Sequence, residues 1–255
     1  MINLDIKGPF NLKHTFESGQ PLAFFGDYKL DNNNEFLSYP TTKGIFYITM
    51  NNNSLSYEFY GDYADEDARK EIIDRLGLHD DLNYIYSKIN TDSYIENNIK
   101  RIRKITLNLI EKFGKQLNIR NENKKLFPDL EDLRKASLND FLSLGLGFRS
   151  KYLYSIVNSI NYDFINEINK LNYNEAKNRL MELEGIGDKV ADCILLFGYK
   201  RLEAFPIDTW VKKAMEEHYL LKKANVKEIH EYANKKWNNL AGYAQQYLFW
   251  YKRNS

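Results

Sequence analysis

The spacing of hydrophobic residues changes near residue 99, and this change restricts the folds that the chain can adopt. Before that point the pattern is typical of strands: Gly44–Met50 and Ser54–Gly61 flank a run of asparagines, which tolerate the left-handed backbone angles of a hairpin turn. From Ile99 onward, as in the stretch 99–113, apolar residues recur at helical spacing. The sequence therefore predicts an α+β protein in which a small antiparallel sheet precedes a mostly helical body.

Helices can be placed within the second part. Ser137 is followed three residues later by Asp140, the spacing of a capping box at a helix start. Apolar residues at helical spacing also mark 149–160. The last long pattern, 227–251, predicts a helix with a weak point at Gly242.

Composition narrows the class of protein. Of the 255 residues, 43% are hydrophobic and 15% aromatic, as in a folded globular chain. A single cysteine, Cys193, excludes an internal disulfide framework and a four-cysteine iron–sulfur or zinc site. The N-terminus lacks the features of a signal peptide, and no window approaches the roughly 18 apolar residues of a membrane span. We expect an intracellular protein without a membrane partner.

The charges are unevenly distributed along the chain. Residues 1–96 contain 8 Lys/Arg against 16 Asp/Glu, whereas residues 97–255 contain 28 against 19. A basic C-terminal part suggests contact with a polyanion, but charges that merely solvate opposite ends explain the same pattern.

The segment "LEGIGDKVADCILLFG" contains two glycines between two helical patterns. Gly185 can close the first helix, Gly187 frees the next turn, and Asp188 begins a second helix that runs to about Phe197. Backbone N–H groups at the start of that helix are a site for a phosphate. An ordinary helical hairpin would give the same pattern.

Lys189 is predicted in the first turn of that second helix. There the positive end of the helix dipole disfavours an ammonium, and burial would add to this effect, so both favour a neutral, nucleophilic amine. Cys193 follows four residues later on the same face. An isolated lysine of this kind is more often an ordinary surface residue.

Asp208, in "FPIDTW", precedes another amphipathic helix and is predicted as its N-cap. If the hairpin packs against that helix, the amine of Lys189 and the carboxylate of Asp208 meet in one pocket. Such a pair suits attack by an amine on an electrophilic carbon.

These segments together resemble a known family. "LEGIGDKVADCILLF", followed by Asp208, resembles the helix–hairpin–helix, Gly/Pro-rich loop and aspartate motif of base-excision DNA glycosylases, and the lysine marks their bifunctional branch. "SGQPLAF", "GLGFRSKY" and "GYAQQYLFWY" lie in the same order as in the 8-oxoguanine DNA glycosylase/AP lyases. The resemblance spans most of the chain.

The resemblance implies a fold and a partner. It places an N-terminal antiparallel sheet domain at 1–76 and a helical body of two subdomains at 77–255. One subdomain is 97–184, and the other joins 77–96 to 185–255 and holds the helix–hairpin–helix. We expect a cytoplasmic monomer, nucleoid-associated in a bacterium, that binds duplex DNA containing 8-oxoguanine, opposite cytosine, without a cofactor or metal ion.

The resemblance also implies catalytic roles. Lys189 attacks C1′ of the sugar, expels the oxidised base and forms a Schiff base, from which β-elimination nicks the strand. Asp208 orients or deprotonates the amine and stabilises positive charge on the sugar.

Further residues are implied to read the damaged base. The carbonyl of Gly19 accepts from the N7–H that distinguishes 8-oxoguanine from guanine. Gln245 binds the Watson–Crick edge, and Cys193 and Phe249 sandwich the flipped base. A half-buried amphipathic end helix would also explain Gln245 and Phe249.

Contacts with the rest of the DNA are implied for a second set of residues. Phe148 fills the gap in the base stack and Arg149 holds the opposite cytosine, although a turn with a surface charge fits the same residues. The hairpin glycines, Gly185 and Gly187, meet phosphates, and Trp210 stands where some members have a histidine. The asparagine run of the family is reduced here, and from it we retain Asn98 and Arg101.

Two other functions are compatible with parts of the pattern. One is a related glycosylase for another lesion, although the iron–sulfur members are excluded because one cysteine cannot hold their cluster. The other is a noncatalytic DNA-binding module, whose salt-sensitive binding would not depend on Lys189.

Overall fold

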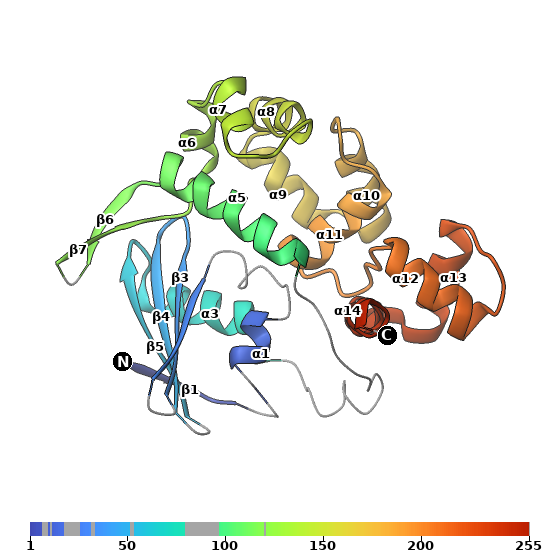
Figure 1. The fold of residues 1–255 in the computed structure, drawn as a ribbon, viewed down its shortest axis with the longest axis horizontal. Coiled ribbons are helices and arrows are strands. Elements are labelled where there is room, and N and C mark those ends of the chain that lie inside the picture. The colour runs from blue at the N-terminus through green and yellow to red at the C-terminus, as the bar shows by residue number, and fades with distance from the viewer. Residues whose placement is uncertain are drawn as a thin grey trace. The chain divides into compact units, whose positions relative to one another are not determined.

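The structure is a computed structural model, and it describes residues 1–6, 10, 12–17, 26–31, 34–51, 54–79, 97–119 and 121–254, with backbone only for 14, 17, 97–101 and 250–254. The described residues form two compact units, one up to Val157 and the other from Asn158 onward. Figure 1 shows a sheet at the N-terminal end of the chain and helices in the rest. This arrangement confirms the predicted α+β class.

The first unit contains a five-stranded antiparallel sheet in the order β1-β5-β4-β3-β2. Its strands are β1 (Ile2–Leu4), β2 (Asp27–Asp31), β3 (Asn34–Pro40), β4 (Gly44–Asn51) and β5 (Ser54–Gly61). The predicted hairpin is confirmed, since β4 pairs with β5 from Gly44 opposite Gly61 to Asn51 opposite Ser54.

Both faces of β4 are covered, because successive side chains of a strand point to opposite sides. Phe46 and Ile48 belong to a core that also includes residues of α1 (Leu12–Glu17) and α3 (Asp65–Leu76). Ile45 lies on the other face and packs with Ile119 and Leu126. Ile119 ends the first strand of a second, smaller hairpin, which consists of β6 (Gln116–Ile119) and β7 (Glu122–Lys125).

Helices complete the first unit: α5 (Asn97–Phe113), α6 (Leu130–Arg134), α7 (Leu138–Ser143) and most of α8 (Arg149–Ser159). The predicted capping box is confirmed at α7, where Ser137 Oγ accepts from the backbone N of Asp140 at 3.2 Å and the Asp140 carboxylate accepts from the backbone N of Ser137 at 2.8 Å.

The second unit is helical (Figure 1). Its elements are α9 (Tyr162–Lys170), α10 (Tyr173–Met181), α11 (Asp188–Tyr199), α12 (Thr209–Ala214), the π-helical turn η1 (Met215–Leu220), α13 (Val226–Trp237), the 3₁₀ turn η2 (Asn238–Leu240) and α14 (Ala241–Asn254). Phe205, Val211 and Ile229 belong to a core that holds α12, α13 and α14 together. None of the helices in the described part of the chain is long and apolar enough to cross a membrane.

The predicted single helix over 227–251 is wrong in one respect. The chain breaks at Asn238, which has φ 48° and ψ −123°, and resumes as α14 from Ala241. Gly242 lies in the first turn of α14 rather than at the break. Its backbone N donates to Leu202 O at 2.7 Å, so α14 approaches the segment before α12 at this point.

Gly242 permits that close approach because it has no side chain. A Cβ at this position would lie 3.1 Å from Leu202 O and 3.3 Å from Ala204 O, and 2.4 Å from Cδ1 of Leu196. Backbone carbonyls cannot move aside as a flexible side chain can, so the contact favours glycine.

We expect Gly242→Ala to lower the free energy of unfolding by about 1–3 kcal/mol, as other overpacked core sites do. Gly198→Ala is the matched control, because this exposed glycine of α11 has nothing within 4 Å of a built Cβ. That control should raise the free energy of unfolding by about 0.5–1 kcal/mol. Urea unfolding followed by tryptophan fluorescence measures both, and similar effects of the two substitutions would contradict the close approach.

Candidate active site

The glycine pair of the second unit forms the turn that leads into α11. Gly185 has φ 85°, a left-handed conformation that favours glycine, and Ile186 donates to Leu183 O at 3.1 Å. Gly187 is the N-cap of α11 with φ −98°, an angle open to any residue, so the expectation that its flexibility shapes the turn is wrong. Its lack of a side chain has another effect: no side-chain cap occupies the first N–H groups of α11. Those groups are available to an anion.

Lys189 lies in the first turn of α11, as predicted, and it is exposed rather than buried. Cys193 lies one turn further on and is half-buried. Burial raises the pKa of the Cys193 thiol, while the charge of the Lys189 ammonium and a hydrogen bond from it lower that pKa in part. The two side chains are therefore neighbours on one face of the helix.

Asp208 is the N-cap of α12, which confirms the prediction. Its Oδ1 accepts from the backbone N of Trp210 at 2.9 Å and from that of Val211 at 2.8 Å. Both bonds use the same oxygen, and within the described residues no hydrogen bond reaches Oδ2. The negative charge of Asp208 also contributes to the raised pKa of Cys193. Lys189 and Asp208 thus both lie close enough to Cys193, within a single unit, to act on the pKa of its thiol.

Two of the residues expected to bind the base, Gln245 and Phe249, lie on α14. Gln245 is buried, with 4% of its surface exposed, and its Oε1 accepts from Nε2 of Gln246. Phe249, one turn later, is half-buried against the core that includes Val211 and Leu248. The shared helical face is confirmed, and the sandwich of a base between Cys193 and Phe249 stays a prediction.

Two further residues, Phe148 and Arg149, lie in the first unit. Phe148 follows a turn in which Gly145 and Gly147 have positive φ, and 62% of its surface is exposed. The guanidinium of Arg149 lies over the Phe148 ring, with 4.6 Å from Cζ to the ring centroid. A large exposed aromatic ring beside a cation is a surface that can stack on a nucleic-acid base.

The remaining predicted residues are placed as follows. Trp210 is 39% exposed and has the Lys213 ammonium 5.5 Å from its ring centroid. Asn98 and Arg101 lie in the first turns of α5, where only the backbone is described. Gly19 lies outside the described residues.

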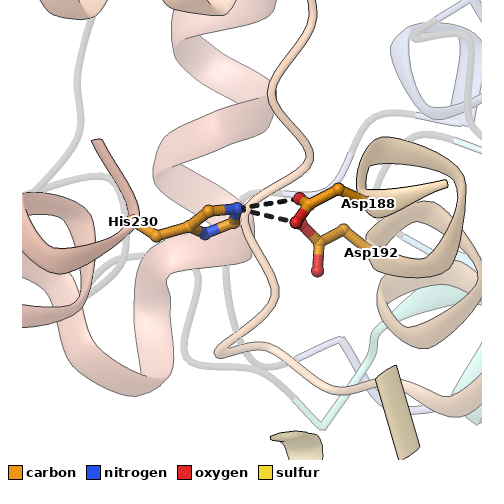
Figure 2. A group of neighbouring side chains, drawn as sticks. All are labelled: Asp188, Asp192 and His230. Atoms are coloured by element: carbon orange, nitrogen blue, oxygen red, sulfur yellow. Dashed lines mark hydrogen bonds and ion pairs between the residues drawn. The ribbon is translucent and has the colours of Figure 1, made fainter. Parts of the chain in front are cut away.

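An ionic cluster beside the site was missed by the sequence reasoning. Figure 2 shows His230 of α13 directed at Asp188 and Asp192 of α11, with Nε2 3.2 Å from Asp188 Oδ1 and 3.3 Å from Asp192 Oδ2. The Lys177 ammonium of α10 lies 3.0 Å from each carboxylate. The hydroxyl of Tyr173 donates to Asp192 Oδ1 at 2.6 Å. We call Tyr173, Lys177, Asp188, Asp192 and His230 the anchor cluster.

Burial dominates the electrostatics of this cluster. It raises the pKa of Asp192, which has no exposed surface, against the opposing effects of Tyr173, Lys177 and His230. Burial also raises the pKa of Asp188. The hydrogen bonds and charges of Lys177 and His230 outweigh that effect, so the pKa of Asp188 is lowered overall. The sequence contained one signal: Asp192 is a lone acid in the apolar run "VADCILLF", four residues after Asp188.

Among the described residues, Asp188, Asp192 and His230 are the group whose donor atoms lie close enough together to hold a metal ion. The Lys177 ammonium bonds both carboxylates, as a bound cation would.

The motif and the fold identify the class of protein. A family model for the HhH-GPD superfamily of base excision DNA repair proteins matches residues 96–239, more than half of the chain. The chain belongs to this superfamily, and the resemblance drawn from the sequence is confirmed.

The chain is similar in sequence to proteins that are named N-glycosylase/DNA lyases. The chain is 36% identical over 135 residues to the probable N-glycosylase/DNA lyase of Methanothermobacter thermautotrophicus, covering 49% of this chain and 43% of that protein. It is 31% identical over 167 residues to N-glycosylase/DNA lyase OGG1 of Arabidopsis thaliana, covering 60% and 46%. The matched region thus spans less than half the length of these two relatives.

Solved structures match over nearly the whole chain. The Clostridium acetobutylicum 8-oxoguanine glycosylase/lyase, in complex with double-stranded DNA containing cytosine opposite 8-oxoG, has a TM-score of 0.77 at 27% identity, covering 96% of this chain and 92% of that one. MBOgg1 in complex with a low-affinity DNA ligand has a TM-score of 0.79 at 26% identity, with the same coverage.

The contact between Lys189 and Cys193 can be tested without DNA. Because burial raises the pKa of Cys193, the rate of its alkylation by iodoacetamide should reach half-maximum above about pH 8.5, the value for an exposed thiol. Lys189→Gln should move that midpoint further upward, because the ammonium lowers the pKa. With one cysteine in the chain the signal has a single source. An unchanged or lowered midpoint in Lys189→Gln would show that the amine and the thiol are not neighbours.

Proposed function

We propose that this chain is a bifunctional DNA glycosylase/AP lyase that excises 8-oxoguanine from duplex DNA in base excision repair. The observation that carries the proposal is that Lys189 and Asp208, at the starts of two helices of one unit, both lie close enough to Cys193 to act on the pKa of its thiol. The similarity to the Clostridium acetobutylicum 8-oxoguanine glycosylase/lyase supports the choice of lesion. The similarity to two N-glycosylase/DNA lyases supports the two activities.

The chemistry begins with the amine of Lys189, which attacks C1′ of the flipped nucleotide in its neutral form. The bond between C1′ and N9 of the base breaks, and the base leaves with the electron pair and takes up a proton. Opening of the sugar ring then leaves a Schiff base between Lys189 and C1′. Loss of a proton from C2′ expels the 3′ phosphate and nicks the strand.

Asp208 supports the first step by its charge. Its Oδ1 is held by two backbone N–H groups, so the carboxylate has a fixed position, and Oδ2 remains for the reacting groups. A fixed negative charge stabilises the positive charge that develops on the sugar as the base departs. The same carboxylate can take or orient the proton of the Lys189 amine.

The residues that bind the DNA have the following roles in our proposal. The carbonyl of Gly19 and the amide of Gln245 read the base, and Cys193 and Phe249 hold its two faces. Phe148 fills the space that the flipped base leaves in the stack, while Arg149 binds the opposite cytosine. The uncapped N–H groups behind Gly185 and Gly187 bind a phosphate.

The proposal also covers the remaining DNA contacts, the oligomeric state, the cofactor and the place in the cell. Asn98, Arg101 and Trp210 contact the DNA, and the enzyme works as a monomer, without a cofactor, in the cytoplasm or on the nucleoid. The domain division into 1–76 and 77–255, with a subdomain at 97–184, is kept as part of the proposal.

Borohydride trapping tests the covalent step. On a duplex with 8-oxoguanine opposite cytosine, the wild type should form a stable adduct, and Lys189→Gln should form none. Lys235→Gln, at an exposed lysine of α13, is the control and should trap as the wild type does. Base release without an adduct would indicate a monofunctional glycosylase, and neither release nor adduct would leave a DNA-binding module or another lesion as substrate.

Asp208→Asn separates the charge of this residue from its role as a cap. Asparagine caps helices as well as aspartate does, so the free energy of unfolding should change little. The single-turnover rate of base release should fall by about 10²–10³-fold, because the negative charge is lost. Asp208→Ala removes the cap as well and should cost about 0.5–2 kcal/mol of stability in addition. Near-normal base release by Asp208→Asn would contradict an electrostatic role.

A further inference from the structure

The first turns of α11 carry two pairs of side chains with different tasks. Lys189 and Cys193 form one pair at a spacing of four residues, and Asp188 and Asp192 form the other. One residue along a helix corresponds to a rotation of about 100°, so the two pairs lie on adjacent faces of the same turns. Whatever fixes the acidic pair therefore also fixes the direction of the lysine.

The acidic pair is held from two other helices. Lys177 and Tyr173 reach it from α10, and His230 reaches it from α13. Asp192 is fully buried, and the side chains of Lys177 and His230 are only 11% and 15% exposed. Buried charged groups with several bonds each have defined positions, because any displacement leaves a buried charge without its partner.

The ammonium of Lys177 offsets part of the negative charge of Asp188 and Asp192. Two carboxylates with their oxygens close together repel each other unless a cation lies between them. Lys177 is that cation, at 3.0 Å from both. Removing its ammonium would leave the two carboxylates with Tyr173 and His230 as partners. One carboxylate would then have to take up a proton or move apart from the other.

We propose that Lys177 is a positioning residue for Lys189: its ammonium is a built-in cation that joins Asp188 to Asp192 and so locks the first turns of α11 to α10 and α13. It follows that the Asp188, Asp192 and His230 group is filled by the protein's own amine and is not a metal site. The link to catalysis rests on the proposed function, whereas the locking of α11 does not.

A cavity beside the cluster makes a direct test possible. It has a volume of about 370 Å³ and is lined by Tyr173, Lys177, Asp188 and His230, among others. Truncation of Lys177 to alanine would leave space, continuous with this cavity, for a small amine from solution. Ethylammonium carries the same charged group as the deleted part of the side chain.

The first measurement uses the Cys193 thiol and needs no DNA. In Lys177→Ala the midpoint of alkylation should fall toward that of the unfolded chain, since α11 loosens and Cys193 loses burial. Ethylammonium should restore the wild-type midpoint, and methylurea, which is neutral, should not. The control is Arg179→Met on the same helix, which loses exposed ion pairs with Glu167 and Glu182 and should leave the midpoint unchanged.

The second measurement addresses catalysis. At saturating lesion duplex, the single-turnover rate of adduct formation should fall by about 10- to 100-fold in Lys177→Ala, because small misplacements of a reacting group have effects of this size. The Kd for the duplex should stay within about twofold, since no DNA-binding residue is changed, and ethylammonium should restore the rate. A wild type that forms no adduct would contradict the proposed function and leave the thiol result intact.

A third variant keeps the test valid if Lys177→Ala does not fold. Asp192→Asn retains the shape of the side chain and its bond from Tyr173 but removes the charge that Lys177 neutralises. Combined with Lys177→Met, it should trap faster than Lys177→Met alone, because both buried charges are then removed together. The proposal is overturned if the Lys177 variants keep the wild-type thiol midpoint and trapping rate. It is equally overturned if wild-type protein binds one equivalent of Mn²⁺ or Zn²⁺ that His230→Gln loses.

Discussion

The start of α11 has to satisfy two opposing electrostatic demands. Its first N–H groups have no side-chain cap, because Gly187 is the N-cap residue. These groups are the positive end of the helix dipole, and Lys189 in the first turn adds a further positive charge there. Neither feature favours the helix. The compensation comes from the neighbouring face, where Asp188 and Asp192 supply negative charge to the same turns and are themselves held from α10 and α13. The uncapped start of α11 is thus kept in place by interactions on a neighbouring face of the helix.

At the start of α12, too, the groups that hold the structure differ from those left open to the site. Asp208 uses one carboxylate oxygen to cap the helix, which fixes the side chain, and the other oxygen is left for the site. Buried residues on either side, Phe205 and Val211, hold the segment to the core of the second unit. Both groups of the proposed chemistry are therefore set by helix starts on a packed framework, and neither depends on a long flexible loop within the described chain.

Local patterns accounted for much of this from the sequence. The hairpin of β4 and β5, the capping box at Ser137 and the cap at Asp208 depend on residues close together in the chain, and all three were predicted. The break at Asn238 was missed because a left-handed asparagine inside a helical pattern has no distinctive neighbours. The anchor cluster was missed because Lys177 and His230 are 53 residues apart, and only the folded chain brings them to the same carboxylates. Its sole trace in the sequence was an acid within an apolar run.

In the sheet, burial limits which side chains β4 can carry. β4 is covered by α1 and α3 on one face. On the other face Ile45 is buried against Ile119 and Leu126, and the next residues on that face, Tyr47 and Thr49, are half-buried. A typical antiparallel strand alternates between positions that must be apolar and positions that are free to vary. In β4 one set is buried and the other is at least half-buried up to Thr49, so substitutions should be tolerated less here than in a strand with one face in water. Among the relatives of this protein, we would expect this strand to diverge more slowly than the exposed edge strand β2.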